Sequence, residues 1–179
     1  MRAQTERLRL EYRDSVARAK ELVGSSTAAA LRTRPEDGSW CAAECLDHLN
    51  LTAEDFIRRI REAVGQTAVR PPRREEKLSL PGRFYVRNYE PPPRRRFTAA
   101  ATLVPAAAGP RIDVLLGRFE QIRTQLIHLV EETDSIDRMR IRLPYADSDW
   151  TRLTLFDTFC LLAAHDRRHL WQAEQAARV

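Results

Sequence analysis

The sequence predicts an all-α protein built as a four-helix bundle. Apolar residues recur at the spacing of one helical face in four separate stretches, and proline and glycine interrupt the chain between them. The expected helices cover residues 5–30, 41–66, 110–137 and 154–177. A chain of 179 residues is of ordinary size for one domain with its own core, so residues 1–179 are expected to form a single domain.

The first two expected helices carry long apolar stripes. In 5–30 the stripe consists of Leu8, Tyr12, Val16, Ala19, Leu22 and Val23. In 41–66 it consists of Cys45, His48, Leu49, Thr52, Phe56, Ile57 and Ile60. Cys41 stands at the cap position of this helix, with Glu44 three residues later. This is a weakened capping box, because the box normally starts with Ser or Thr.

The last two expected helices begin with recognisable signals. Pro110 suits the first turn of the third helix, whose stripe runs through Ile112, Leu115, Leu116, Phe119, Ile122, Leu126, Leu129 and Val130. Thr154 and Asp157 form a capping-box variant at the start of the fourth, which carries Leu155, Phe156, Phe159, Cys160, Leu162 and Ala163.

The connection 67–109 between the second and third helices contains seven prolines and is long enough to cross the whole bundle. Within it, "LPGRFYVRNYE" could form one short helix, whereas residues 139–153 are expected to be a second, irregular connection. The net charge of +5 is concentrated in the crossover, because residues 68–96 contain nine basic and three acidic side chains. This arginine-rich segment either recognises an anionic small molecule or is a solvated loop whose arginines pair with nearby carboxylates.

Composition excludes several classes of protein. Hydrophobic residues make up 43% of the chain and charged residues 31%, which is typical of a globular protein. No run approaches the roughly 20 apolar residues of a membrane span, and the charged N-terminus lacks the apolar core of a signal peptide. A cytoplasmic location without membrane contact is therefore expected. The three cysteines, Cys41, Cys45 and Cys160, form no CxxC pair and are expected to be buried apolar residues.

Three of the four histidines form a candidate metal site. His165 and His169 are four residues apart, so a helix places both rings on one face, although this spacing alone is a weak signal. His48 lies on the inner face of the second helix, where a buried imidazole needs partners for its nitrogens. His128 falls on a polar face and is expected to be exposed.

The heights of these residues favour one topology. His48 lies about 10 Å from the start of its helix, and His169 lies about 12 Å from the end of the fourth. The histidines share one level if the second and fourth helices are antiparallel. The second and third helices are then parallel, which requires the long crossover. The sequence therefore predicts an up-down-down-up bundle.

The stretches "WCAAECLDHL" and "HDRRHLWQ" together resemble the DinB-like superfamily, which includes the YfiT-type proteins described as metal-dependent hydrolases. The family pattern is roughly W-[ST]-x-x-E-x-x-x-H-L early in the chain and H-x-x-R-H-x-x-Q late. The likeness covers most of the chain. Cys41 departs from it, since Ser or Thr is usual at that position, and this affects only the helix cap.

The resemblance implies a metal site and a small-molecule reaction. It would make His48, His165 and His169 the ligands of a divalent ion, zinc or nickel. Trp40, Glu44, Arg168 and Gln172 match family-typical positions. Some members resemble thiol S-transferases that use a low-molecular-weight thiol such as bacillithiol or mycothiol, and many have no assigned reaction.

Three neutral ligands leave coordination positions open, as in catalytic rather than structural sites. Glu44, one turn before His48, could orient that imidazole, act as a general base or simply cap the helix. Gln172 could hydrogen-bond a ligand or water, or be solvated. Cys45 could be a fourth ligand, but a thiolate there would fill the open position. Asp47 and Asp166 are expected to point away, toward solvent or arginines.

The expected function is that of a divalent-metal-dependent enzyme, a thiol S-transferase or hydrolase that activates a thiol or water. The main alternative is a non-catalytic bundle protein that binds a metal or ligand. A nucleic-acid-binding module is less favoured, because no helix-turn-helix, zinc-finger or RNA-binding motif accompanies the basic segment. The partners expected are a small molecule, which the arginines would favour as an anion, and a second copy of the chain in a homodimer.

Overall fold

The computed structural model describes residues 1–68, 70–72, 75–93, 95, 97–106, 109–145 and 148–178, the last range without the side chains of residues 148–150. In chain order its elements are α1 (Ala3–Ser25), α2 (Ala28–Arg32), α3 (Ala42–Gln66), α4 (Leu80–Tyr89), the 3-10 turn η1 (Ala101–Leu103), α5 (Ile112–Glu132), β1 (Arg142–Tyr145), β2 (Ser148–Thr154) and α6 (Leu155–Ala176). The protein is therefore mostly helical, with a small two-stranded sheet. Among the described residues, no helix combines the length and the apolar composition needed to cross a bilayer.

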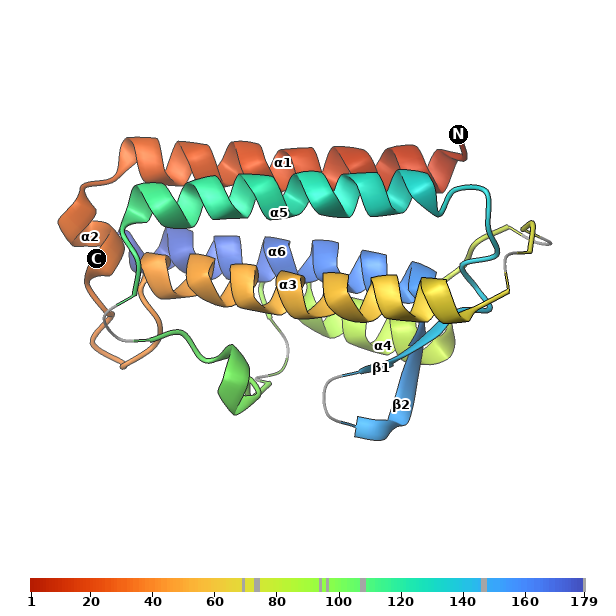
Figure 1. Ribbon diagram of the computed structural model, residues 1–179. Helices are drawn as coiled ribbons and strands as arrows, with labels where there is room; N and C mark the ends of the chain where they lie inside the picture. The colour runs from red at the N-terminus through yellow and green to blue at the C-terminus, as the bar shows by residue number, and fades with distance from the viewer. Residues whose placement is uncertain are drawn as a thin grey trace.

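Four long helices, α1, α3, α5 and α6, lie side by side around the core (Figure 1). Both α3 and α1 pack against α5 and α6. Figure 1 shows α3 and α5 running in one direction and α1 and α6 in the other. The chain between α3 and α5 therefore has to return along the bundle, and α4 and η1 lie on this return path.

The core forms because each long helix turns an apolar face toward the others. Leu8, Phe56, Leu126 and Phe159 come from α1, α3, α5 and α6 and belong to one cluster of buried side chains. Each large apolar side chain buried in this way contributes roughly 1.5–3 kcal/mol. The hydroxyl group of buried Tyr12 donates to the carbonyl oxygen of Phe159 at 2.9 Å, so the polar atom of this ring is paired as well.

The stretch 5–30, expected to be one helix, is divided into α1 and α2. The Ser25 hydroxyl donates to the Glu21 carbonyl oxygen at 2.7 Å, and α1 ends there. The Thr27 hydroxyl accepts the N–H of Ala30 at 3.1 Å and so caps a new helix. Short polar side chains that bond the nearby backbone thus separate two segments that the apolar pattern joins.

The other three helices follow the apolar pattern more closely. α3 and α6 lie within residues 41–66 and 154–177, and α5 begins near the expected start. However, α5 ends at Glu132 rather than at residue 137. The Thr133 hydroxyl donates to the Leu129 carbonyl oxygen at 2.6 Å, and the chain turns immediately after it.

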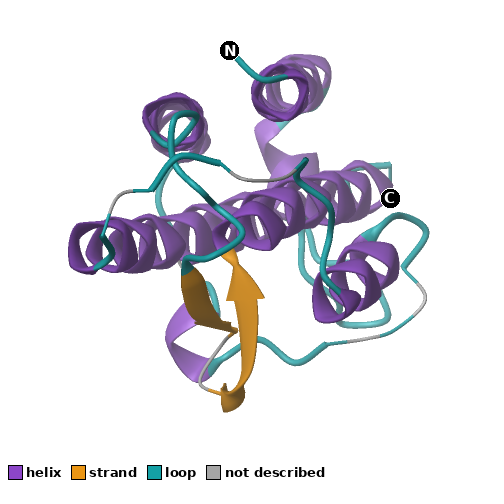
Figure 2. Cartoon of the chain, turned by 90° about the vertical axis from the view of Figure 1, so that its right-hand side faces the viewer, coloured by secondary structure: helices purple, strands orange, loops and turns teal. Residues whose placement is uncertain are grey.

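Residues 139–153, expected to be irregular, instead contain the antiparallel hairpin of β1 and β2 (Figure 2). Buried Leu143 pairs with buried Leu153, whereas Arg142 is exposed. The alternation from Ile141 to Leu143 is the pattern of a half-buried strand, but it is too short to stand out from the sequence alone. The all-α expectation is wrong to this extent.

The short helix expected in the crossover is present as α4, and one carboxylate fastens it to α6. Asp157 accepts the backbone N–H and the hydroxyl of Ser79 at 2.9 and 2.7 Å, and the N–H of Thr154 at 3.0 Å. The same side chain therefore stabilises the starts of both helices. A Cβ atom at Gly82 would lie 2.2 Å from the Asp157 carboxylate, so this close approach requires glycine.

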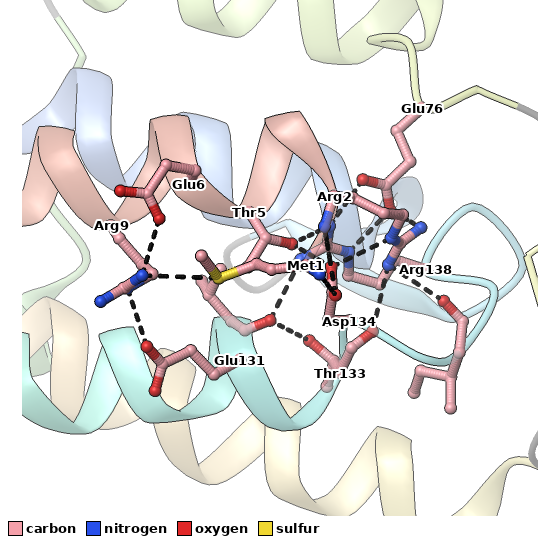
Figure 3. Close-up of polar contacts among 12 residues, drawn as sticks. Met1, Arg2, Thr5, Glu6, Arg9, Glu76, Glu131, Thr133, Asp134 and Arg138 are labelled. Carbon is pink, nitrogen blue, oxygen red and sulfur yellow. Dashed lines mark hydrogen bonds and ion pairs between the residues drawn. The ribbon is translucent and has the colours of Figure 1, made fainter.

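A buried ion-pair network ties the start of α1 to the crossover and to the turn after α5 (Figure 3). Arg138 is fully buried and donates to both carboxylate oxygens of Glu76 at 2.6 Å. Its Nη2 atom also donates to the Thr5 hydroxyl at 3.0 Å. Arg2 lies 3.0 Å from Glu76 and 3.1 Å from Asp134, so the charges of this network compensate one another.

Candidate metal centre

His48, His165 and His169 lie together between α3 and α6. His48 comes from the second turn of α3, and the other two come from successive turns of α6. All three are buried, and each pair of rings has its centroids within 5.0 Å. One ring nitrogen from each histidine lies within 4.8 Å of the other two. The structure thus brings together the three side chains that the sequence singles out, whose role as ligands stays a prediction.

The spacing of the nitrogens suits a divalent cation. The Nε2 atoms of His48 and His165 are 3.2 Å apart. Two nitrogens that bind zinc at about 2.0–2.1 Å with a tetrahedral angle between them would be roughly 3.3 Å apart. The three imidazoles therefore fit a cation with three nitrogen ligands and at least one free position.

Hydrogen bonds on the outer side of the rings set the tautomers. A carbonyl oxygen only accepts, so His48 donates from Nδ1 to Leu103 O at 2.7 Å. His169 likewise donates from Nδ1 to the Gln172 Oε1 atom at 3.1 Å. In neutral imidazoles this leaves the Nε2 atoms of His48 and His169 unprotonated, which is the form that binds metals. The carbonyl of Leu103, in the crossover, is a partner that no side-chain pattern reveals.

The histidines are held in their neutral form. Burial lowers the pKa of His48, although its bond to Leu103 works in the opposite direction. Burial, together with the neighbouring histidines, also holds the pKa of His165 and of His169 well below the usual value. Metal binding requires neutral imidazole, which is the form that these lowered pKa values favour.

Glu44 caps α3. Its carboxylate accepts the backbone N–H of Cys41 at 3.0 Å and the Nε–H of Arg34 at 2.9 Å. Burial alone would raise the pKa of Glu44, but the hydrogen bonds from Arg34 and Cys41 bring it below the usual value. The structure therefore contains the capping interaction, and a further role of Glu44 as general base at the histidines stays a prediction.

Cys45 is not placed as a fourth ligand. It is fully buried in an apolar cluster with Leu22, Leu31 and Ala173, and burial raises its pKa well above the usual value. A protonated thiol in such surroundings behaves as a small apolar side chain.

The remaining polar neighbours are arranged as expected. Asp166 points away from the histidines and forms a buried ion pair with Arg123, whose Nε atom lies 3.1 Å away. Asp47 faces Arg118 at 3.9 Å, and His128 is exposed. The Gln172 side chain, by contrast, bonds directly to a candidate ligand.

A pocket of about 120 Å³ opens beside the histidines. It is lined by residues that neither histidine motif includes, among them Thr52 and Arg59 of α3, Tyr89 of α4, Phe97 of the crossover and Tyr145 of β1. Trp40, which the family pattern does mark, lines it too, with its ring centroid 4.7 Å from that of His48. Aromatic walls of this kind are typical of small-molecule sites.

The arginines of the crossover do not line this pocket where they are described. Arg70, Lys77, Arg83, Arg87 and Arg95 are exposed, and Arg73, Arg74, Arg94 and Arg96 lie outside the described residues. The arginines that line the pocket are instead Arg59 of α3 and Arg168 of α6, and burial lowers the pKa of Arg168. The late family motif, in which Arg168 stands directly before His169, had already marked this arginine.

The family assignment agrees with this geometry. A model of the DinB superfamily matches residues 11–173, which include both histidine motifs and all four long helices except the first residues of α1 and the last residues of α6. No curated protein and no solved structure matched the chain. Since the match covers most of the 179 residues, the chain belongs to the DinB superfamily.

Proposed function

We propose that this chain is a divalent-metal-dependent enzyme that acts on a small molecule, as a thiol S-transferase or a hydrolase. The observation that carries the proposal is the convergence of three buried, neutral imidazoles at the wall of an aromatic pocket. Three nitrogen ligands leave room for a further ligand on the cation, which is the arrangement of catalytic zinc sites. Imidazole ligands suit both zinc and nickel, the two metals that the family resemblance implies.

A bound divalent ion would lower the pKa of a coordinated water or thiol and polarise the group under attack. The chain itself supplies position and surroundings. Leu103 and Gln172 hold two of the imidazoles in the orientation that ligation requires. The aromatic side chains around the pocket exclude water from one side of a bound substrate.

We further propose that α1, α3, α5 and α6 form an up-down-down-up bundle. The helix directions in Figure 1 support this, as does the long return path between α3 and α5. In this arrangement α3 and α6 are antiparallel, so the early histidine and the late pair meet at one level.

Metal analysis of protein purified without a histidine tag tests the proposal. We expect about one divalent ion per chain in the wild type, and a loss of affinity of at least about 100-fold in His165→Ala, because only two nitrogen ligands remain. His128→Ala is the matched control, since this imidazole is exposed and beside Glu131. Wild-type protein without a stoichiometric metal, or full metal content in His165→Ala, would refute the proposal.

A second measurement separates the enzyme from a metal-binding protein without catalytic activity. The metal-loaded protein is incubated with a low-molecular-weight thiol and an electrophile, and separately with an activated ester. In at least one of these assays, we expect the wild-type protein to turn over substrate faster than His165→Ala does. A chelator should abolish this activity. Metal binding without turnover in either would favour the non-catalytic alternative.

A further inference from the structure

We propose that the pocket beside the histidines binds a small organic anion with a single flat ring, whose charge faces Arg168 and whose polar group hydrogen-bonds Thr52. The proposal deepens the proposed function by naming the substrate class, and it rests on that function for the reaction. Binding of the anion, however, does not require the metal.

Arg168 carries a buried positive charge. The residue is 8% exposed. Its Nη1 and Nη2 atoms donate to the carbonyl oxygens of Asn88 and Arg95 at 3.2 and 2.9 Å, and its guanidinium lies over the rings of Tyr89 and Phe97. Across the residues that the structure describes, no carboxylate forms an ion pair with it.

Among the described residues, the other two deeply buried arginines show how unusual this is. Arg123 is paired with Asp166, and Arg138 is paired with Glu76. Arginine stays charged in proteins, and a charge taken out of water without a counter-charge is strongly unfavourable. Arg168 lines the pocket, so an anion bound there would supply the counter-charge that the described residues lack.

Thr52 provides the second, independent observation. Three buried side-chain atoms among the described residues have no hydrogen-bond partner: Arg2 Nη1, Arg9 Nε and Thr52 Oγ1. The two arginine atoms form ion pairs, with Glu76 and Glu131, so the Thr52 hydroxyl is the one left over. Thr52 lies one helical turn after His48 and lines the same pocket. A buried hydroxyl without a partner is costly, and a ligand atom would satisfy it.

The shape of the pocket limits the rest of the ligand. Its volume of about 120 Å³ is close to the roughly 150 Å³ of a protein cavity that binds one benzene molecule. Phe97, Tyr89, Tyr145 and Leu161 give it apolar and aromatic walls. The acidic group in its lining, Asp55, is already paired with two arginines of α3 and so does not oppose an anion.

Benzoate and benzamide are suitable probes, because they have nearly the same shape and only benzoate is charged. Each is titrated calorimetrically into protein freed of metal with a chelator. We expect benzoate to bind at least about tenfold more tightly than benzamide, as a charge-assisted hydrogen bond implies. Equal affinities, or no binding of benzoate, would overturn the proposal. If the protein that has not been treated with the chelator contains no bound metal, this result would count against the proposed function alone.

Thr52→Val tests the hydroxyl at nearly unchanged volume. We expect it to weaken benzoate binding about three- to tenfold. We also expect it to raise the melting temperature of the ligand-free protein, because an unpaired buried hydroxyl is removed. Thr133→Val is the matched control: its hydroxyl is buried but paired, so the melting temperature should fall and benzoate affinity should not change.

Unchanged benzoate affinity in Thr52→Val would overturn the assignment of Thr52. Arg168→Met should abolish the preference for benzoate over benzamide, and a retained preference would overturn the assignment of Arg168. If Arg168→Met fails to fold, the comparison of the two probes on the wild type still decides whether the pocket recognises an anion.

Discussion

Two clusters of buried polar side chains in this bundle are built in opposite ways. In the network around Arg138, the guanidinium donates to Glu76 and Thr5, and Arg2 adds a second cation to the same carboxylate. In the histidine cluster the outer nitrogens of His48 and His169 are paired, while the inner nitrogens face one another. The first cluster satisfies its own charges, and the second leaves lone pairs available.

The difference separates residues that stabilise the fold from residues that are free to bind. A closed network of charges gives strong pairwise attraction in a region of low dielectric constant, and removing one member leaves an uncompensated charge. Neutral imidazoles contribute little by facing one another, since neither charge nor strong hydrogen bonding links all three. We therefore expect substitutions in the first cluster to reduce stability, and substitutions in the second to reduce metal affinity.

The largest effect is expected for Arg138→Met. The change leaves the buried Glu76 carboxylate with one fewer partner, so the free energy of unfolding should fall by about 3–5 kcal/mol. Urea denaturation followed by circular dichroism measures this. The double variant Arg138→Met/Glu76→Leu should recover part of the loss, because no unpaired carboxylate remains. If Arg138→Met is as stable as the wild type, the pairing of Arg138 with Glu76 does not stabilise the fold.

An intermediate effect is expected for Gln172→Met. The side chain keeps its approximate size but loses the oxygen that accepts from His169 Nδ1. Metal affinity should fall by about 10- to 100-fold, as is typical when the hydrogen-bond partner of a ligating histidine is removed. Competition with a chromogenic chelator measures it, and the melting temperature of the metal-free protein should hardly change. An unchanged affinity would show that Gln172 does not orient the ring.

The smallest effect is expected for Lys20→Met. Lys20 pairs with Glu120 at 2.8 Å across α1 and α5, but the Lys20 side chain is exposed and the Glu120 side chain is partly exposed. An exposed ion pair of this kind stabilises a protein by less than about 1 kcal/mol. Denaturation under the same conditions as for Arg138→Met gives the comparison. A loss similar to that of Arg138→Met would mean that burial does not determine the strength of these pairs.

The elements that depend on a long apolar period could be read from the sequence. The stripe from Cys45 to Ile60 places α3 and its inner face, and with them His48. The spacing of His165 and His169 then follows from helix geometry alone. Glu44 was harder, because the same position suits both a helix cap and a site role, and only the structure shows the cap, in the bond from the Cys41 N–H.

The parts that could not be read depend on contacts between distant segments. Thr52 looks like an ordinary member of the stripe until its hydroxyl is found without a partner. The residues next to Tyr89 and Phe97 in the sequence do not indicate that the rings of these two residues pack against the Arg168 guanidinium. Similarly, the hairpin near Leu143 has too few residues to show a period, and its pairing with Leu153 stabilises it instead.

The bond from His48 to the backbone of Leu103 has a consequence for how this site tolerates change over evolutionary time. A main-chain oxygen is supplied by whichever amino acid stands there, so exchange of residue 103 for another type leaves it in place. Deleting or inserting a residue shortly before it would shift the oxygen out of reach. The site should therefore accept many sequences in this segment but few lengths.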